Sequence, residues 1–424
     1  MKIEELHQYF LNSSGICTDT RKISKNCLFF ALKGDNFNGN RFSNGAVELG
    51  AYKVIIDDEA YQNEHSILVD NVLESLQKLA SFHRDYLSIP IIALTGSNGK
   101  TTTKELINVV LSKKYNTTAT IGNLNNHIGV PLTLLSMNSD TELGIVEMGA
   151  NHHHEIDFLC NIAKPNYGYI TNFGKAHLEG FGSLEGVVKA KTEMYRYLKN
   201  NHKTVFVNSN DEKQLLHSDG INTFTFGNDQ QNCHIDLIDA SSKLLIRFQD
   251  TFIQSKLIGL YNFNNIAAAI TIGKYFEVST DDIKNAIEDY VPTNNRSQII
   301  IKGTNKIILD AYNANPSSMM AALENFTQSE GTNKIAFLGD MFELGTEAEV
   351  EHQNIVTFLE NNFKGTCYLI GENFNKTIIN TSNIYKFNDF EAFKSTFKNQ
   401  NTSNHHMLIK ASRGMALERI LDVF

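Results

Sequence analysis

The sequence predicts an α/β protein of three domains: a small N-terminal α/β domain, a central domain on a mostly parallel sheet, and a C-terminal Rossmann-like α/β domain. The chain of 424 residues, 42% hydrophobic and 20% charged, has an ordinary globular composition and is too long for one core. Short apolar runs alternate with helical patterns, which indicates parallel sheets covered by helices. Proline-containing breaks near 88–90 and 292–296 interrupt this alternation. We therefore expect domains over residues 1–83, 84–296 and 297–424.

The first domain, residues 1–83, is expected to be a small α/β unit. Strands are predicted over 27–32 and 53–57, because both are short apolar runs bounded by turn residues. A helix is predicted to end near Gly50. Residues 34–39 are rich in Gly, Asn and Asp, which is typical of a turn.

The second and third domains each contain apolar runs separated by helical patterns. We predict strands over 91–94, 144–148, 167–171 and 204–208, and over 306–311, 334–338, 366–370 and 407–410. Ligands of open parallel sheets bind beyond the carboxyl ends of the strands. The segments that directly follow these runs are therefore candidate binding segments.

Charge and cysteine usage limit the function. A net charge of −9 argues against a general nucleic-acid-binding protein, because the chain has no basic excess to neutralise phosphates. The five cysteines lack the spacing of zinc or redox motifs, and we interpret them as buried thiols of a reducing cytosol. The first residues lack a signal segment, and no apolar run approaches the roughly 18 residues of a membrane span. We expect a cytoplasmic protein with no membrane or nucleic-acid partner, and by default a monomer.

The most informative segment is the turn after the run 91–94. It contains Gly96, Ser97, Asn98, Gly99, Lys100, Thr101 and Thr102, and an amphipathic helical pattern follows. The glycines allow backbone N–H groups to face an anion, and the helix start adds its positive end. Lys100 can reach the outer phosphates of a nucleotide, and the Thr101 hydroxyl can ligate Mg²⁺. Leu94 stands where the common phosphate loop has its first glycine, but strand, turn and helix together predict nucleotide binding.

Two polar residues follow neighbouring predicted strands. Glu147 ends an apolar run and, beside a phosphate loop, is suited to hold Mg²⁺; the alternative is a solvated glutamate at a strand end. His177 lies in the loop after the next run, where it can ligate a metal or contact phosphate; the alternative is a hydrogen-bonded loop histidine. Because both residues follow strands near the predicted phosphate loop with Lys100, we favour a metal-binding or phosphate-binding role for Glu147 and His177.

Other charged segments carry weaker signals. His152, His153 and His154 are adjacent, whereas metal sites use spaced ligands, so we interpret them as the polar surface start of a helix. From composition alone, Lys191 and Glu193 are predicted to be exposed helix charges.

In the third domain, polar residues follow two predicted strands. Asp310 can bond a ribose, and residues 312–318 form a rigid polar turn before a helix or, alternatively, an ordinary loop. Lys410 and Arg413, around Ser412, suit an anionic ligand or, alternatively, form a surface basic pair.

Taken together and in order, these segments resemble the Mur ligases, ATP-dependent amide-forming enzymes of bacterial peptidoglycan synthesis. The resemblance covers essentially the whole chain and includes residues 95–102, 122–131, 147–149, 172–193 and 259–269. It implies ATP and two Mg²⁺ ions as cofactors, with Lys100, Glu147, His177, Lys191 and Arg296 as catalytic residues. It places Asn262, Asn265, Arg296 and Asp310 with the phosphate loop at ATP, and Thr101, Glu147, His177 and a carbamylated Lys191 at the metals.

Within the family, residues 310–316 look like the branch that adds D-alanyl-D-alanine to UDP-N-acetylmuramoyl-tripeptide. This implies that the first domain binds the UDP-sugar and the third binds the dipeptide and closes on ATP. The implied substrate residues are Thr18, Asp19, Thr20, Arg21, Gly34, Asp35, Asn126, Tyr312, Asn313, Asn315, Ser318, Lys410, Ser412 and Arg413. The chain departs from the family pattern at Thr20, Tyr261, Leu309 and Ala411.

The resemblance implies phosphorylation of the tripeptide carboxylate by ATP, attack of the dipeptide amine on the acyl phosphate, and release of phosphate. Two alternatives stay open. One is a sister ligase of the Mur or folylpolyglutamate type that adds a single amino acid. The other is an ATP-binding protein without catalytic activity.

Overall fold

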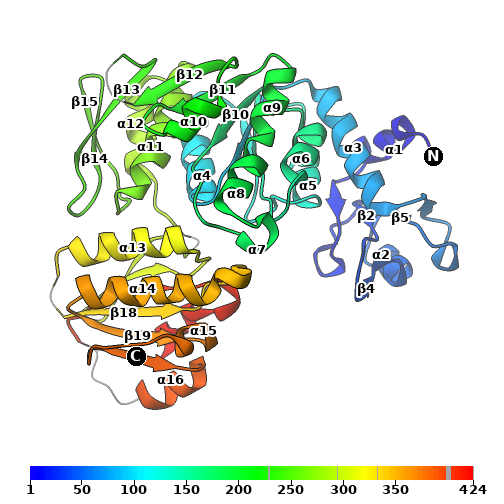
Figure 1. Cartoon of the computed structure of the whole chain (residues 1–424). Coiled ribbons are helices and arrows are strands. Elements are labelled where there is room, and N and C mark those ends of the chain that lie inside the picture. The colour runs from blue at the N-terminus through cyan, green and yellow to red at the C-terminus, as the bar shows by residue number, and fades with distance from the viewer. Residues whose placement is uncertain (228–229, 294, 332, 398–402, 424) are drawn as a thin grey trace.

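The computed structural model (Figure 1) describes residues 1–227, 230–293, 295–331, 333–397 and 403–423. Within them, sheets of four, nine and six strands follow one another along the chain, with an additional two-stranded ribbon. This confirms the predicted α/β class. The central domain lies between the other two: in Figure 1 the first domain lies at its right and the third below it.

The first domain is built on a parallel sheet in the order β1-β2-β5-β6. Its strands are β1 (Ile16–Cys17), β2 (Leu28–Phe30), β5 (Lys53–Ile56) and β6 (Ser66–Leu68); the ribbon is β3 (Lys33–Gly34) with β4 (Phe37–Asn38), and the helices are α1 (Ile3–Leu11) and α2 (Ser43–Glu48). The two predicted strands are confirmed, and the predicted turn at 34–39 forms most of the ribbon. The sequence did not reveal β1 and β6, which are too short for a periodic pattern.

Helix α3 (Val72–Leu87) connects the first domain to the central one. The Asn71 side chain caps its start by accepting from the Glu74 N–H at 2.9 Å. Leu76, Leu79 and His83 recur at helical spacing on its buried face, which packs against α1 and α5. The helix therefore ties the two domains together through a shared apolar stripe.

The central sheet has the order β15-β14-β13-β12-β11-β10-β7-β9-β8, parallel from β8 to β13 and antiparallel beyond. Its strands are β7 (Ile91–Thr95), β8 (Thr117–Ala119), β9 (Leu143–Glu147), β10 (Tyr167–Ile170), β11 (Thr204–Asn208), β12 (Asn222–Gly227), β13 (Cys233–Asp239), β14 (Leu245–Phe248) and β15 (Thr251–Gln254). Its helices are α4 (Lys100–Leu111), α5 (Gly129–Leu135), α6 (Glu155–Ala163), α7 (Leu178–Phe181), α8 (Leu184–Lys191), α9 (Glu193–Asn200), α10 (Glu212–His217), α11 (Tyr261–Tyr275) and α12 (Thr280–Asp289).

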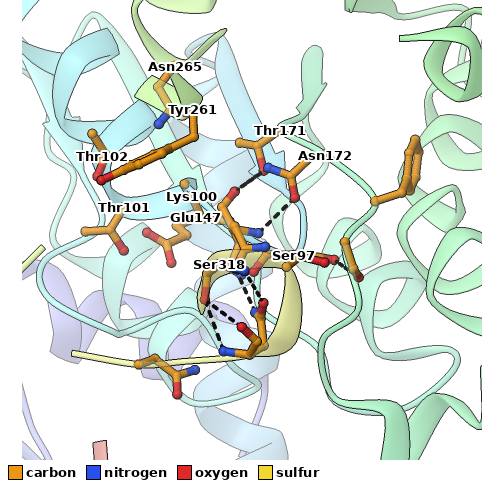
Figure 2. A pocket seen from close by; sticks show the side chains of 18 of the residues that line it. Ser97, Lys100, Thr101, Thr102, Glu147, Thr171, Asn172, Tyr261, Asn265 and Ser318 are labelled. Carbon is orange, nitrogen blue, oxygen red and sulfur yellow. Dashed lines mark hydrogen bonds between the residues drawn. The ribbon is translucent and has the colours of Figure 1, made fainter. Parts of the chain in front are cut away.

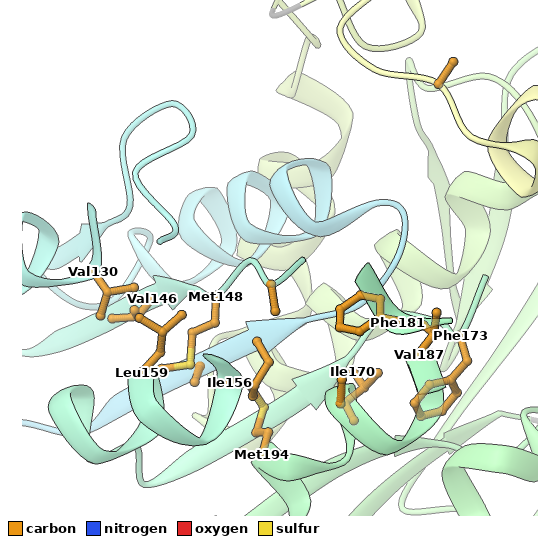
Figure 3. Packing of buried hydrophobic residues seen from close by; sticks show 14 of the residues in the cluster. Val130, Val146, Met148, Ile156, Leu159, Ile170, Phe173, Phe181, Val187 and Met194 are labelled. Carbon is orange, nitrogen blue, oxygen red and sulfur yellow. The ribbon is translucent and has the colours of Figure 1, made fainter. Parts of the chain in front are cut away.

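The inner strands of this sheet are apolar on both faces. In β7, Ile91 joins the cluster under α5, α6 and α9, whereas the adjacent Ile92 joins the cluster under α4, α11 and α12. Figure 3 shows part of the first cluster, where Val146 lies beside Leu159 and Ile156 lies beside Met194. Burial on both faces produces the continuous apolar runs from which the sequence predicted β7, β9, β10 and β11. Strands β12 to β15 were not predicted, because they expose part of their length or one face.

The third sheet has the order β16-β17-β21-β18-β19-β20 and is parallel except for β16. Its strands are β16 (Gln298–Lys302), β17 (Asn305–Asp310), β18 (Lys334–Gly339), β19 (Thr366–Ile370), β20 (Ile384–Phe387) and β21 (His406–Lys410); its helices are α13 (Pro316–Gln328), α14 (Ala348–Asn362), α15 (Glu372–Lys376) and α16 (Phe390–Phe397). The four predicted strands are confirmed. All five cysteines are free and buried, as predicted. Among the described residues, no helix has the length and apolar character needed to cross a membrane.

Candidate active site

The phosphate loop connects β7 to α4, as predicted. Gly96 and Gly99 both have positive φ, at 143° and 78°. A Cβ on Gly96 would lie 2.0 Å from the Thr171 hydroxyl, and one on Gly99 would lie 2.6 Å from the Asn265 amide oxygen. Both positions therefore require glycine, for conformation and for space.

Residues after β10 hold this loop in place. The Asn98 N–H donates to the Asn172 side chain at 3.1 Å, and the Thr171 hydroxyl donates to the Asn98 carbonyl at 2.6 Å. The Ser97 hydroxyl donates to the Gly174 carbonyl at 2.8 Å. Figure 2 shows Thr171, Asn172 and Ser97 in this part of the site. These hydrogen bonds connect the phosphate loop to the segment that follows β10.

Lys100 lies at the first position of α4 with its ammonium folded toward the loop. Its Nζ donates to the Gly96 carbonyl at 2.7 Å and to the Ser97 carbonyl at 3.3 Å. Burial lowers the pKa of Lys100; the Glu147 carboxylate opposes this shift and Arg296 adds to it. An anion bound in the loop would supply the countercharge that this buried ammonium lacks.

Glu147 ends β9 and is 1% exposed. Its Oε1 accepts from the Asn125 amide at 2.9 Å, whereas its buried Oε2 has no hydrogen-bond partner among the described residues. In Figure 2, Glu147 lies next to Thr101, and both present oxygens to the same space. An unpaired carboxylate oxygen beside a hydroxyl fits a hard cation such as Mg²⁺.

The predicted exposure of Lys191 and Glu193 is wrong. Both were predicted to be exposed, but each is 1% exposed. The reason is their place on the helices: Lys191 follows Val187 by one turn on the buried face of α8, and Glu193 starts α9 beside the buried Met194. The Lys191 Nζ donates to the Ala150 carbonyl at 3.3 Å and lies 5.2 Å from the centre of the Phe181 ring.

The electrostatics of Lys191 are unusual for a lysine. Burial holds its pKa well below the usual value, the charge of Lys100 lowers it further, and Glu155 and Glu193 oppose the shift. Glu193 itself accepts from the His154 and Asp157 N–H groups, at 2.8 and 3.1 Å, and so caps the start of α6. The Lys191 ammonium therefore loses its proton more readily than that of an exposed lysine.

The histidine run is a surface segment, as interpreted from sequence. His152 and His154 are exposed and the run ends where α6 begins. Among the described residues, no group of three or more His, Cys, Asp or Glu side chains is placed to hold a metal. A metal at Glu147 would therefore complete its shell with hydroxyl, water or ligand oxygens.

The start of α11 lies over the phosphate loop. The Asn265 amide oxygen accepts from Thr103 at 3.0 Å, and its nitrogen donates to Asn262 at 2.9 Å. The Tyr261 hydroxyl is hydrogen-bonded to the Ser297 hydroxyl at 2.8 Å. Asn262 and Asn265 are buried and brace the helix start, and Tyr261 lies beside them at the cavity (Figure 2).

The third domain contacts the loop region directly. The Asn315 amide donates to Asn98 in the phosphate loop at 2.7 Å. The Lys175 ammonium lies 2.6 Å from a Glu351 oxygen, and His177 forms an ion-pair contact with Glu343. The domains therefore meet around the loop, and His177 is held from across the interface.

Asp310 and Lys410 pair at the carboxyl edge of the third sheet. Their side chains are 2.5 Å apart, and Asp310 also accepts from the Ser297 N–H at 3.1 Å. Lys410 is 2% exposed, so its interpretation as half of a surface basic pair is wrong; β21 lies between β17 and β18 and carries it into the interior. Arg413 is exposed and pairs with Glu418 at 2.7 Å.

Near this pair, the Arg296 guanidinium stacks 3.8 Å from the centre of the Tyr312 ring, and its buried Nε has no hydrogen-bond partner among the described residues. Asn315 and Ser318 form a capping box at the start of α13. The Ser412 hydroxyl donates to the Ala314 carbonyl at 3.2 Å and accepts from the Phe342 N–H at 2.9 Å. Ser412 therefore holds the 312–316 loop through its hydrogen bond to the backbone of that loop.

One cavity of about 1010 Å³ collects most of the predicted residues. Its lining includes Ser97, Asn98, Gly99, Lys100, Thr101, Thr102, Asn126, Glu147, His177, Asn262, Asn265, Arg296, Asp310, Tyr312, Asn313, Asn315, Ser318 and Lys410. Gly96, Lys191, Ser412 and Arg413 are not among the lining residues. A cavity of this size, with charged groups of both signs, can hold a nucleotide and a second polar ligand.

The predicted UDP-sugar residues lie elsewhere, on the first domain. Asp19 caps a 3₁₀ turn, Thr20–Lys22, and its hydrogen bonds from Arg21 lower the pKa of Asp19 to about 2. Gly34 and Asp35 are exposed at the β3–β4 ribbon. None of Thr18, Asp19, Thr20, Arg21, Gly34 and Asp35 lines the cavity.

Sequence reasoning assigned no role to Asn125 or Glu343. Asn125 holds one oxygen of Glu147, and its place in an Asn-rich loop before α5 is a weak local signal. Glu343 has a positive φ of 63° and reaches His177 from another domain, so no local pattern could reveal it.

Comparisons with known proteins identify the family. Three family models match: the Mur ligase family catalytic domain over residues 12–84, the Mur ligase middle domain over 94–273, and the Mur ligase glutamate ligase domain over 295–413. UDP-N-acetylmuramoyl-tripeptide--D-alanyl-D-alanine ligase of Bacillus subtilis is 34% identical and covers 96% of this chain and 92% of its own length. The chain belongs to the Mur ligase family.

Further Mur ligases agree with this membership. The ligase of the same name from Rickettsia prowazekii is 32% identical over 98% of this chain and 96% of its own length. A crystal structure of MurF from Acinetobacter baumannii has a TM-score of 0.88 and 28% identity, covering 99% of this chain and 98% of that chain. MurF from Thermotoga maritima in complex with ADP has a TM-score of 0.85 and 26% identity, covering 98% and 97%.

Proposed function

We propose that this Mur ligase joins D-alanyl-D-alanine to UDP-N-acetylmuramoyl-tripeptide with conversion of ATP to ADP and phosphate, giving the UDP-linked pentapeptide used in peptidoglycan synthesis. Relatives carrying that name match nearly the full length of this chain. The observation that carries the proposal is the cavity of about 1010 Å³ that is lined both by the phosphate loop of the central domain and by residues between 310 and 318 of the third domain. The nucleotide and the amine substrate would therefore bind between the two domains, close to one another.

The central domain is proposed to bind ATP, as its MurF relative binds ADP. The backbone of residues 96–102 and Lys100 face the phosphates, while Asn262 and Asn265 brace the adjoining wall. The unpaired Glu147 oxygen and the Thr101 hydroxyl would hold one Mg²⁺, and His177, which lines the same cavity, would contribute to holding a second. When bound, Mg²⁺ supplies positive charge that offsets the repulsion between a carboxylate and the phosphates.

The chain's own residues account for the two chemical steps. The terminal tripeptide carboxylate attacks the γ-phosphorus and ADP leaves; Lys100 and Arg296 offset the negative charge of this step. The dipeptide amine then attacks the acyl carbon, loses a proton, and displaces phosphate to form the amide. Residues 312–318 and Lys410 are proposed to position the dipeptide beside the acyl phosphate, and Asp310, paired with Lys410, is proposed to contact ATP. Closure of the third domain on the loop excludes water from an intermediate that water would destroy.

Lys191 is proposed to act as a carbamate. Its neutral amine attacks CO₂, a C–N bond forms and a proton is released, so a buried base becomes an anion. Its low pKa and its burial support this, because only the neutral amine is a nucleophile. The carbamate would help to hold the second Mg²⁺, which an ammonium would repel.

The first domain, residues 1–83, is proposed to bind the UDP-sugar through Thr18, Asp19, Thr20, Arg21, Gly34 and Asp35. These residues lie outside the cavity, so the substrate must extend from the first domain to the interface of the domains proposed over 84–296 and 297–424. We further propose a monomer acting in the cytoplasm, where ATP is supplied.

The test is phosphate release from ATP and Mg²⁺ with the UDP-linked tripeptide and D-alanyl-D-alanine added singly and together. We expect release that requires both substrates, with a UDP-linked pentapeptide detected by mass. Release with a single amino acid in place of the dipeptide would identify a sister ligase instead. No release with any pair would favour an inactive nucleotide-binding protein.

A further inference from the structure

A second cavity lies between helices α8, α9 and α10 of the central domain. Its volume is about 740 Å³, within the range of small-molecule pockets. Its walls are largely apolar and include Leu184, Val188, Leu216 and Ile221. Leu216 is 72% exposed at the edge of the cavity, so a substantial apolar surface is left in contact with water.

The rim of this cavity is basic, in a chain whose net charge is −9. Lys189, Arg196, Lys199 and Lys213 all belong to the lining, and Glu185 is the one carboxylate among its described residues. Arg196 lies 3.9 Å from Glu193, but neither Lys189 nor Lys213 has a carboxylate within ion-pair distance in the described part of the chain. Cations that lack partners around an apolar hollow favour an anionic ligand with an apolar body.

The second cavity adjoins the nucleotide cavity but is distinct from it. Lys213 belongs to the lining of both, and the His217 ring lies 6.4 Å from that of Phe173, which lines the nucleotide cavity. Helix α8 presents Val188 and Lys189 to the second cavity and ends at the buried Lys191. A ligand there would therefore touch the helix that carries Lys191 without entering the nucleotide cavity.

We propose that the cavity between α8, α9 and α10 is a second binding site, for a small molecule that joins an apolar body to a carboxylate, sulfonate or phosphate group. The apolar body fills the hollow beside Val188 and Leu216, and the anionic group lies at the rim near Lys189 and Lys213. This site is independent of the ligase assignment.

The first test uses anilinonaphthalene sulfonate, an apolar anion whose fluorescence rises in apolar surroundings, with the full-length folded protein. We expect saturable binding of one dye per chain that ADP does not displace. Lys189→Glu should raise the dissociation constant about tenfold, because it replaces attraction by repulsion at the rim. Lys243→Glu, an equal charge reversal at an exposed residue outside the lining, should leave it unchanged.

A second measurement separates the site from non-specific adsorption. Decanoate should displace the dye much more strongly than decanol, which has a comparable apolar chain without the charge. Leu216→Asp, at an exposed position that folding tolerates, should also weaken dye binding. Displacement by ADP, equal displacement by decanol, or binding unaffected by both substitutions would each overturn the proposal.

Discussion

Replacing Lys191 with methionine should raise stability while removing activity. Lys191 is 1% exposed, and its ammonium has one long hydrogen bond, 3.3 Å to the Ala150 carbonyl. Methionine has a similar length and carries no charge, so it removes a buried group that is costly to keep protonated. Replacing buried charges by apolar side chains gains about 1–4 kcal/mol, so we expect a gain of about 2 kcal/mol, or about 4–8 °C in the melting temperature of the central domain.

The pH dependence gives this prediction a second check. The pKa of Lys191 is held below its usual value, so the unfolded chain binds its proton more tightly than the folded one. The penalty is therefore present below the ordinary lysine pKa of about 10.4 and shrinks as the pH rises toward it. The gain of Lys191→Met over wild type should be larger near neutral pH than near that value.

The assay is thermal unfolding of both proteins without bicarbonate or Mg²⁺, followed by phosphate release with both substrates. Activity should fall at least about a hundredfold, because a group proposed to hold a metal is lost. Lys189→Met, at an exposed lysine of the same helix, is the matched control and should change stability by less than about 0.5 kcal/mol. A Lys191→Met protein that is less stable than wild type, or that remains active, would refute the reasoning.

Three further predictions follow from other contacts. Lys100→Ala should lower kcat/KM for ATP about a thousandfold by removing the cation at the phosphates, whereas Lys113→Ala, just beyond the same helix, should have no such effect in steady-state kinetics. Glu147→Gln keeps the side-chain length but not the charge, and should raise the Mg²⁺ concentration for half-maximal turnover at least about tenfold; an unchanged Mg²⁺ titration would contradict the metal role. His83 Nε2 donates to the Met137 carbonyl, so in the neutral ring its Nδ1 accepts from His7 Nε2 at 3.0 Å. Burial lowers the pKa of both rings, so their contact stabilises the packing of α1 on α3 above about pH 6.5 and is lost as the pH falls below that value. Hydrogen exchange of the α1 amides should therefore become faster below about pH 6.5. Protection of these amides that does not change with pH would contradict the role of the histidine pair.

Local patterns in the sequence were sufficient for the inner strands and the phosphate loop. Strands β7, β9, β10 and β11 are buried on both faces, and such burial requires a continuous apolar run that can be recognised without the fold. The loop at 96–102 needs glycines at fixed positions, because a side chain there would collide with Thr171 or Asn265. Strands that are very short, or that expose one face or part of their length, have no such run unless their neighbours are also apolar, as they are for β2. Strands β1, β6, β8, β12 to β16 and β20 were therefore not predicted.

The sequence by itself determined the class of fold, the nucleotide loop and the family, because each depends on residues that are close in the chain. The tertiary structure alone decided which charges are buried and what faces them. Lys191 resembles an exposed helix lysine in the sequence, but it lies on the buried face of α8. Lys410 resembles a surface cation, but its strand β21 pairs between two other strands. The contact of His177 with Glu343 joins residues of different domains. Burial and charge pairing depend on contacts between distant segments, which periodicity along the chain cannot record.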